Sequence, residues 1–170
     1  NDKPSAFRYP RGNGVGVNLP SIDEKIEIGK GRIIKEGKKV AILNFGARLN
    51  ECLIAQESLS KKGINITLID ARFAKPLDEN LIWQIATDHE VLITIEEGSI
   101  GGFGSHVGQF LADKSLLDNN LKYRSFILPD RFIDHDKPDF MYKYAGLDAN
   151  SIEAKILDTL NSKIIIKKSN

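Results

Sequence analysis

The sequence is poor in cysteine, has no long apolar run and carries almost no excess charge. Cys52 is the single cysteine, which excludes an internal disulfide and suits a reducing compartment. No apolar stretch approaches the roughly 20 residues that a membrane span requires. The formal net charge of +1 creates no field that would attract nucleic acid or a membrane surface. We therefore expect neither nucleic acid nor membrane as a partner.

An initiating methionine and a signal-peptide pattern are also missing. Because the chain opens with Asn1, we expect it to be a piece of a longer protein. Its 170 residues are enough for one domain with a real core but not for two full ones. The composition, 41% apolar and 28% charged, is typical of an ordinary globular domain rather than a disordered chain.

Strand and helix patterns alternate from residue 31 onward. Alternation of this kind predicts a three-layer α/β/α domain with a mostly parallel sheet covered on both faces. The expected strands are 31–36, 39–44, 64–70, 91–95 and 122–128, with the first two paired as a hairpin around Gly37. The expected helices are 49–62, 78–87, a third leading in from Ser105 and ending near 114, 140–144, and 151–160 with Asn150 or Ser151 as cap. The first helix is expected to bury Leu53, Ile54 and Leu59. Gly63 should end the first helix and Asp78 should open the second.

The first thirty residues have a different character. Residues 4–17 begin as a short strand and continue as a glycine-rich loop, and nothing nearby in the sequence would cover that strand. We therefore assign 1–17 to the end of a preceding domain. Residues 18–30 are polar, contain Pro20 and show no helical period, so we interpret them as a linker. The domain proper is expected to cover 31–170.

A glycine-rich turn follows the strand expected at 91–95. Glu96 and Glu97 end the strand, and glycines stand at 98, 101, 102 and 104 before a helix begins. A dinucleotide fingerprint would place its third glycine at residue 107, which is Val107, and a P-loop would need a lysine that is missing. Two glutamates would also repel an anion. The pattern favours a tight, packed turn in which one glutamate accepts hydrogen bonds from the loop or from a partner subunit.

No catalytic set of nucleophile, base and acid can be assembled from the single residues. The histidines at 89, 106 and 135 lack the spacing of metal ligands. We interpret His89 as a surface residue, while His106, beside the glycine turn, is the histidine that could serve a site. Cys52 has apolar neighbours on its expected helix and is interpreted as a buried structural thiol. Trp83 lies at helical spacing and is expected to pack inward.

Six stretches together carry a more specific pattern. They are AFRYPRGNGVGV (6–17), IGKGRIIKEGKKVAILNFGA (28–47), DARFAKPLDENLI (70–82), ITIEEGSIGGFGSHV (93–107), LPDRFIDHD (128–136) and YAGLDANSIEAKI (144–156). In the same order and over nearly the whole chain, they resemble the carboxyl-terminal part of the 1-deoxy-D-xylulose-5-phosphate synthase family. That family is related to transketolase and to the pyruvate dehydrogenase β subunit, which share the strand, acidic pair and GG-x-G turn. Among them, RYPRGN and D-x-R-F-x-K-P-L-D are specific to the synthase.

The resemblance implies a transketolase C-terminal-domain-like fold and a parent enzyme of the transferase class. That enzyme condenses pyruvate with D-glyceraldehyde 3-phosphate, releases CO2 and forms 1-deoxy-D-xylulose 5-phosphate for isoprenoid, thiamine and pyridoxal biosynthesis. It implies thiamine diphosphate and Mg2+, bound by domains absent from this sequence. The fragment alone is then expected to be inactive and to serve in domain packing and homodimerisation. The expected location is the bacterial cytoplasm, or the plastid for a eukaryotic source.

The resemblance also implies one substrate-binding residue and no catalytic, cofactor-binding or metal-binding residue in the fragment. Arg11, the second arginine of RYPRGN, matches the arginine that binds the phosphate of glyceraldehyde 3-phosphate. A permanently charged planar guanidinium followed by Gly12 and Gly14 suits bidentate phosphate binding. Arg8 would face the opposite side of a strand and is interpreted as structural. The matched residues Asp70, Arg72, Lys75 and Asp78 are expected to be scaffold.

Two other functions stay open at this stage. The chain could be a stand-alone α/β module that binds a nucleotide or small anion, although the phosphate fingerprints fail. It could instead be the partner-docking domain of a dehydrogenase-type complex. The synthase-specific motifs favour the interpretation as a synthase C-terminal domain over both of these alternatives.

Overall fold

A computed structural model describes residues 3–9, 14, 16–17, 21 and 25–161. The elements within them are β1 (Arg32–Lys35), β2 (Val40–Phe45), α1 (Leu49–Lys61), β3 (Thr67–Asp70), α2 (Glu79–Asp88), β4 (Val91–Glu96), α3 (Phe103–Asp113), β5 (Lys122–Phe126), α4 (Pro138–Ala145) and α5 (Ala149–Asn161). The five strands form a sheet of order β1-β3-β2-β4-β5, in which β2 to β5 run parallel while β1 is antiparallel to β3. No helix in this part of the chain is long and apolar enough to cross a membrane.

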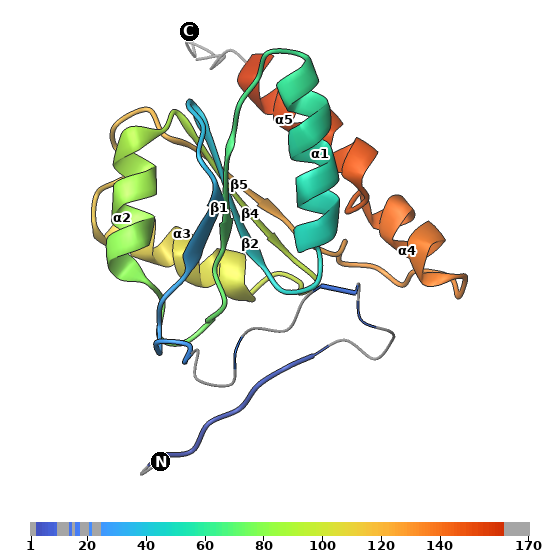
Figure 1. Ribbon diagram of the computed structural model, residues 1–170, viewed down its shortest axis with the longest axis horizontal. Helices are drawn as coiled ribbons and strands as arrows, with labels where there is room; N and C mark the ends of the chain where they lie inside the picture. Colours follow the sequence, from blue (N-terminus) through green and yellow to red (C-terminus); the bar gives the residue numbers. More distant parts are fainter. Residues whose placement is uncertain (1–2, 10–13, 15, 18–20, 22–24, 162–170) are drawn as a thin grey trace, which may run out of the picture.

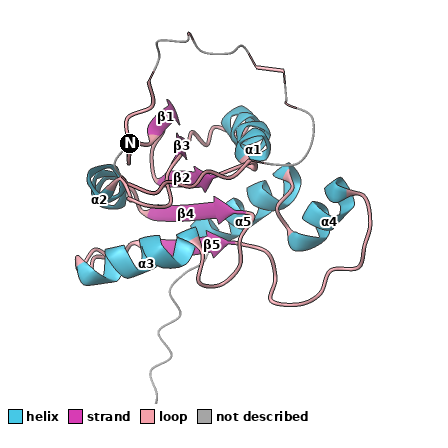
Figure 2. Cartoon of the chain, turned by 90° about the horizontal axis from the view of Figure 1, so that it is seen from below, coloured by secondary structure: helices cyan, strands magenta, loops and turns pink. Residues whose placement is uncertain are grey.

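The helices cover both faces of the sheet, so the predicted three-layer α/β/α architecture is confirmed. Figures 1 and 2 show α1 and α5 packed side by side on one face, with α2 and α3 on the other. Helix α4 lies at the carboxyl end of the sheet beside the α1 and α5 layer. This arrangement follows from connecting parallel strands through helices, which places the crossovers on the faces of the sheet.

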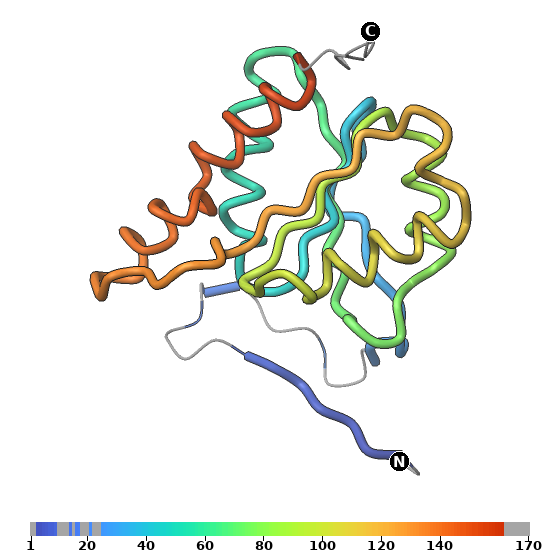
Figure 3. Tube along the Cα trace, turned by 180° about the vertical axis from the view of Figure 1, so that it is seen from behind, coloured from blue at the N-terminus to red at the C-terminus, as the bar shows by residue number. Residues whose placement is uncertain are grey.

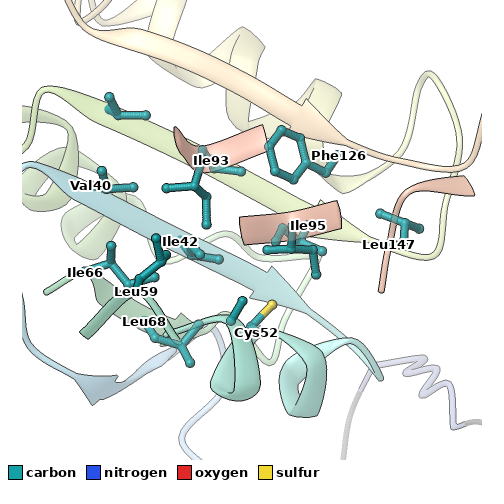
Figure 4. Close-up of a cluster of buried hydrophobic side chains, with 14 residues drawn as sticks. Val40, Ile42, Cys52, Leu59, Ile66, Leu68, Ile93, Ile95, Phe126 and Leu147 are labelled. Atoms are coloured by element: carbon teal, nitrogen blue, oxygen red, sulfur yellow. The ribbon is translucent and has the colours of Figure 1, made fainter. Parts of the chain in front are cut away.

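Two apolar cores fill the space between these layers. Because successive strand residues point to opposite faces, Val40 and Ile42 of β2 enter the α1 and α5 core while Ala41 and Leu43 enter the α2 and α3 core. Figure 4 shows the first core, where Ile42 packs near Leu59 of α1. Full burial of each such leucine or isoleucine contributes about 1.5–3 kcal/mol. Burial on both faces explains the nearly continuous apolar runs of β2 and β4.

The predicted hairpin around Gly37 is wrong. β3 inserts between β1 and β2, and β1 pairs with β3 in antiparallel register, Ile33 opposite Ile69. The connection from β1 to β2 passes over the chain that leads into β3, where the Lys38 N–H donates to the Asn65 carbonyl at 2.9 Å. A side chain at Gly37 would overlap the backbone of Asn65 and Ile66. Glycine at this position therefore serves a chain crossing rather than a hairpin turn.

Helix ends follow the sequence signals with one difference. Gly63 follows α1 with a left-handed φ of 78°, as a glycine beyond the end of a helix should. The Asp78 carboxylate caps α2 by accepting from the Leu81 N–H at 3.2 Å. Helix α5 begins before the expected cap, and Asp148 accepts from the Ser151 N–H at 3.3 Å. An aspartate two residues upstream of Asn150 thus does the capping.

Two apolar side chains that were expected to be buried are about half exposed to solvent. Trp83 is 54% exposed and Ile54 is 48% exposed, so the expectation that they pack inward is wrong. Small residues and a glutamine complete the buried face of α1, where Ala55 and Gln56 lie beside Leu59. A helical period is compatible with more than one buried stripe, and contact with the sheet selects one of them.

The amino-terminal segment carries no strand within described residues 4–9, contrary to expectation. Figure 3 shows this segment running apart from the sheet. A strand needs a neighbour to pair its backbone groups, and no sheet edge lies next to these residues. The linker is described only in part, at residue 21 and from 25 onward, and there it contains no helix or strand.

Candidate functional site

The carboxyl edge of the sheet is where an α/β domain of this topology places its functional groups. From β2 the chain leaves to β3 on one side, whereas β4 lies on the other, so the order of strands reverses between β2 and β4. Phe45 and Glu96, the last residues of these strands, are register partners. The acidic pair Glu96 and Glu97 therefore lies at this reversal point, next to the loop that leads into α1.

Glu96 is a buried carboxylate that caps helix α3. It is 5% exposed and accepts hydrogen bonds from the Phe103 N–H at 3.0 Å and the Gly104 N–H at 2.8 Å. These two amides belong to the first turn of α3, where backbone donors have no partner within the helix. A Cβ at Gly102 would lie 2.6 Å from a Glu96 carboxylate oxygen. The glycine turn thus makes room for the carboxylate, which confirms the predicted tight turn with a glutamate as acceptor.

This arrangement bears on the anion-binding interpretation. A phosphate at a helix N-terminus uses the same kind of unpaired backbone amides. At α3 the Glu96 carboxylate already accepts from two of them and places a negative charge at the helix start. The glycine turn is therefore unsuited to a nucleotide or free phosphate.

Glu97 points toward the opposite layer and joins an arginine and a tyrosine. The Arg48 Nε donates to the Glu97 carboxylate at 2.8 Å, and the Arg48 guanidinium lies 3.7 Å from the centre of the Tyr142 ring. Partial burial and a hydrogen bond with Glu97 raise the pKa of Tyr142. The cluster ties the start of α1, the end of β4 and helix α4 together. Because the Arg48 guanidinium already donates to the Glu97 carboxylate, we assign Arg48 a positioning role.

Asn44 and Cys52 lie beneath this cluster in the core. Both are fully buried, and the Asn44 amide donates to the Gly46 carbonyl at 2.9 Å. The Cys52 thiol donates to the side-chain oxygen Oδ1 of Asn44 at 3.7 Å. Burial raises the pKa of the Cys52 thiol to about 12. The predicted structural thiol is therefore confirmed, because a protonated buried thiol is a poor nucleophile.

The three histidines lie in different parts of the domain. His89 is half-buried rather than freely exposed, and both of its ring nitrogens are bonded, to the Thr67 hydroxyl at 2.7 Å and to the Ile85 carbonyl at 2.9 Å. It borders a hollow of about 700 Å3 at the amino-terminal edge of the sheet, opposite the acidic pair. His106 is half-buried on the first turn of α3, and His135 is exposed. In the described part of the chain, no three histidine, cysteine, aspartate or glutamate side chains gather as a metal site.

In the block at 70–78, Asp70, Arg72 and Asp78 make structural hydrogen bonds, as predicted for these three residues. Asp78 joins its helix cap to a bond from the Gly31 N–H at 3.1 Å, which fixes the entry to β1. Asp70 accepts from the Arg32 Nε at 3.1 Å across the antiparallel pair. The Arg72 N–H donates to the Asp70 carboxylate at 3.3 Å. This corner holds the edge strand β1 against β3.

The predicted phosphate-binding residue, Arg11, lies outside the described residues. Neither Arg48 nor Tyr142 was among the residues predicted from the sequence to serve a site. Arg48 follows the end of β2 by three residues, a position that could have drawn attention to it. Tyr142 gave no local signal because its partners come from distant parts of the chain.

Comparison with known proteins agrees with the geometry. The family described as "Transketolase, C-terminal domain" matches residues 29–152. A split-gene transketolase, solved as an inactive β4 tetramer, is 28% identical over 84% of this chain with a TM-score of 0.72. Transketolase from Campylobacter jejuni (16% identity, 83% of this chain, TM-score 0.58) and a Pichia stipitis transketolase mutant in complex with xylulose 5-phosphate (13%, 78%, 0.54) share the fold. This chain spans 46%, 20% and 18% of the three, respectively.

Proposed function

Because this chain belongs to the transketolase C-terminal domain family, we propose that it is the third domain of a 1-deoxy-D-xylulose-5-phosphate synthase. The observation that carries the proposal is the occurrence of two synthase-type motifs in a chain of this family, RYPRGN at 8–13 and DARFAKPLD at 70–78. The second motif forms the corner that fixes β1 and caps α2. Residues 1–17 are then the end of the preceding domain, and 18–30 the linker.

The parent enzyme would condense pyruvate with D-glyceraldehyde 3-phosphate and release CO2. Transketolase-family enzymes use thiamine diphosphate and a divalent metal. The described residues do not fit either group, because they gather no metal-binding side chains and the Glu96 carboxylate occupies the amides at the start of α3. Both cofactors would be held by the preceding domains. The fragment alone would be inactive, and the parent enzyme would work in the bacterial cytoplasm or in a plastid.

Arg11 would supply the fragment's one direct contact with substrate, the phosphate of glyceraldehyde 3-phosphate. A guanidinium can meet a phosphate through two parallel hydrogen bonds, and Gly12 leaves the backbone beside it open to close approach. A hydrogen bond to a charged group is worth about 1.5–3 kcal/mol, which corresponds to roughly 10- to 100-fold in affinity.

The remaining role would be assembly. The relative solved as a β4 tetramer associates through copies of its own chain, and transketolase-family domains pack with other domains. The turn at 98–104 lies at the carboxyl edge of the sheet, where a neighbouring domain or subunit could reach it. We assign the fragment to domain packing and to the homodimer.

The test is product formation by the longer protein with thiamine diphosphate and Mg2+ present. For the Arg11→Ala variant we expect KM for glyceraldehyde 3-phosphate to rise about 10- to 100-fold while KM for pyruvate changes little. The control is Arg8→Ala, which removes the same charge three residues earlier and should leave both constants near wild type. No product from the wild-type protein would refute the synthase assignment. Unchanged kinetics in Arg11→Ala would refute only the role of Arg11.

A further inference from the structure

The hollow at the amino-terminal edge of the sheet is large enough to hold a small molecule. Its volume is about 700 Å3, within the roughly 300–1,000 Å3 of small-molecule sites. Its lining comes from the β1–β2 connection, the start of β3, the carboxyl end of α2, the turn into β4 and the α3–β5 connection. We call it the amino-edge hollow, and the lining side chains that decide its chemistry are Lys38, Lys39, Thr67, Asp88, His89 and Glu90.

Two polar side chains of the amino-edge hollow are held in place by a series of hydrogen bonds. The Gly37 N–H donates to the Thr67 hydroxyl at 3.0 Å, and this hydroxyl lies 2.7 Å from His89 Nε2. The Ile85 carbonyl, 2.9 Å from His89 Nδ1, can only accept, so Nδ1 carries a proton. The Thr67 hydroxyl then donates to Nε2, and all of these groups are satisfied with a neutral imidazole. His89 thus orders the hollow without bringing a positive charge to it.

The carboxyl end of α2 lacks the positive charge that the end of a helix favours. Unpaired backbone carbonyls give this end a partial negative charge, which a nearby cation stabilises. Instead α2 ends at Asp88, its last turn holds no basic residue, and Glu90 follows two residues later. Among the described residues, no side chain forms a salt bridge or hydrogen bond with either carboxylate. A ligand with a positive charge would supply what this end of α2 lacks.

The β1–β2 connection brings two cations to the same hollow. Lys38 and Lys39 line it, and neither ammonium group is in a salt bridge within the described part of the chain. Lys39 has a left-handed φ of 63°, which residues other than glycine rarely adopt. Its carbonyl accepts from the N–H groups of Glu90 and Val91, both at 2.9 Å, so this strained residue is fixed against the start of β4. Backbone strain that the surrounding structure enforces is concentrated at ligand sites.

We propose that the amino-edge hollow binds a small zwitterion, an amino acid with one ammonium and one carboxylate group. The ammonium lies with Asp88 and Glu90 at the carboxyl end of α2, and the carboxylate meets Lys38 and Lys39. A ligand with a single charge would face like charges in the same hollow, so the mixed lining discriminates against simple cations and simple anions. The inference goes beyond the proposed synthase function and does not rest on it.

The affinity follows from the exposure of the charged side chains. Asp88, Glu90, Lys38 and Lys39 are all exposed, and ion pairs at exposed sites are weak and screened by salt. We therefore expect a dissociation constant on the order of 1 mM at low ionic strength. Titration followed by amide chemical shifts in NMR measures binding in this range and reports where the ligand binds.

The test uses the 15N-labelled 170-residue chain and a series of probes. Glycine, 4-aminobutanoate and 6-aminohexanoate are zwitterions with increasing separation of the two charges, whereas hexanoate and hexylamine each carry one of them. At least one zwitterion should shift the amide signals of residues 37–39 and 88–90 in a saturable manner. Hexanoate and hexylamine should bind at least tenfold more weakly. Binding of either single-charge probe as tight as that of the best zwitterion, or no saturable shift with any zwitterion, would overturn the proposal.

Two variants and one matched control locate the site. Asp88→Asn and Lys38→Gln should each weaken binding of the best zwitterion at least threefold, and Asp88→Asn should stay folded because it removes a negative charge from the negative end of a helix. The control is Asp113→Asn, the last residue of α3, which is also exposed but does not line the hollow. It should bind like the unmodified chain. Equal weakening in all three variants would overturn the proposed site, whereas failure of the synthase assay would leave this result unaffected.

Discussion

Glu96 and Glu97 are neighbours in the chain but serve different layers of the molecule. Strand residues alternate between faces, so Glu96 reaches the amides that begin α3, whereas Glu97 reaches Arg48 on the α1 and α4 side. The two carboxylates therefore do not form a catalytic pair. Each fixes one helix to the end of β4, and the glycines that follow them provide the space for this.

Gly102 gives the residue-scale prediction. In Gly102→Val a side chain would meet the Glu96 carboxylate, since even a Cβ would lie 2.6 Å from it. The carboxylate must shift and lose bonds to two amides, so we expect the free energy of unfolding to fall by about 2–4 kcal/mol. Urea denaturation followed by circular dichroism measures the change.

Gly14→Val is the matched control, because no atom lies within 4 Å of a Cβ at Gly14 and its φ is not left-handed. Its unfolding midpoint should equal that of the unmodified chain. A Gly102→Val protein with unchanged stability and sedimentation would contradict both the capping role of Glu96 and the assignment of this turn to assembly.

Among the elements, α2 depends most visibly on one side chain. The Asp78 carboxylate accepts from the Leu81 N–H inside the helix and from the Gly31 N–H before β1, and Lys30 Nζ lies 3.6 Å away. One aspartate thus secures both the helix start and the entry to the edge strand. The loss of such a cap costs about 0.5–2 kcal/mol.

We therefore expect Asp78→Ala to lower the free energy of unfolding by about 2 kcal/mol, at the upper end of that range because a second backbone donor also loses its partner. Asp78→Asn retains a good capping oxygen and should lose less than half as much. Hydrogen exchange should show faster exchange in both α2 and β1 of Asp78→Ala. Exchange confined to α2 would show that Asp78 does not hold the edge strand.

At the scale of the whole molecule, each of the two cores holds or adjoins a weakly acidic side chain whose pKa is raised. Burial raises the pKa of Cys52, in the α1 and α5 core, from 9.0 to about 12. Burial raises the pKa of Tyr123, beside the α2 and α3 core, from 10.0 to about 12. The Tyr123 hydroxyl donates to the Gly104 carbonyl at 2.6 Å and is also 3.0 Å from the Thr94 hydroxyl.

Alkaline pH should therefore destabilise both layers together. The folded-state pKa values lie above the unfolded ones, so this stability is complete below about pH 9 and is lost as pH rises toward 12. We expect the urea midpoint to fall between pH 9 and pH 11. In Tyr123→Phe the accompanying decrease in the free energy of unfolding should be smaller by about 1 kcal/mol at pH 11.

The comparison with Tyr123→Phe separates this effect from titration of lysines, which both proteins share. Tyr123→Phe should start less stable at pH 8, since it lacks the bond to Gly104. Parallel declines in the two proteins would contradict the role of Tyr123. A urea midpoint that stays constant from pH 8 to pH 11 would contradict the raised pKa values of both Cys52 and Tyr123.

The amino-acid sequence by itself determined the layers of this domain and several of its local ends. Alternating apolar periods of two and 3.6 residues required strands and helices to alternate, and short connections required parallel strands with helices on both faces. Gly63 ends α1 and Asp78 caps α2 through groups only a few residues away. Cap and turn chemistry of this kind is local, so it can be read without knowledge of distant contacts.

Only the tertiary structure decided which distant segments meet. β1 leaves its sequence neighbour and pairs with β3, and Arg48 meets Glu97, 49 residues away, and Tyr142. Ile54 and Trp83 fit a helical period yet lie outside, because the sheet selects which stripe of a helix it buries. These outcomes depend on competition between pairings and packings far apart in the chain. A local sequence pattern does not encode that competition, and the folded molecule settles it through the contacts that bury most apolar surface and leave fewest polar groups without partners.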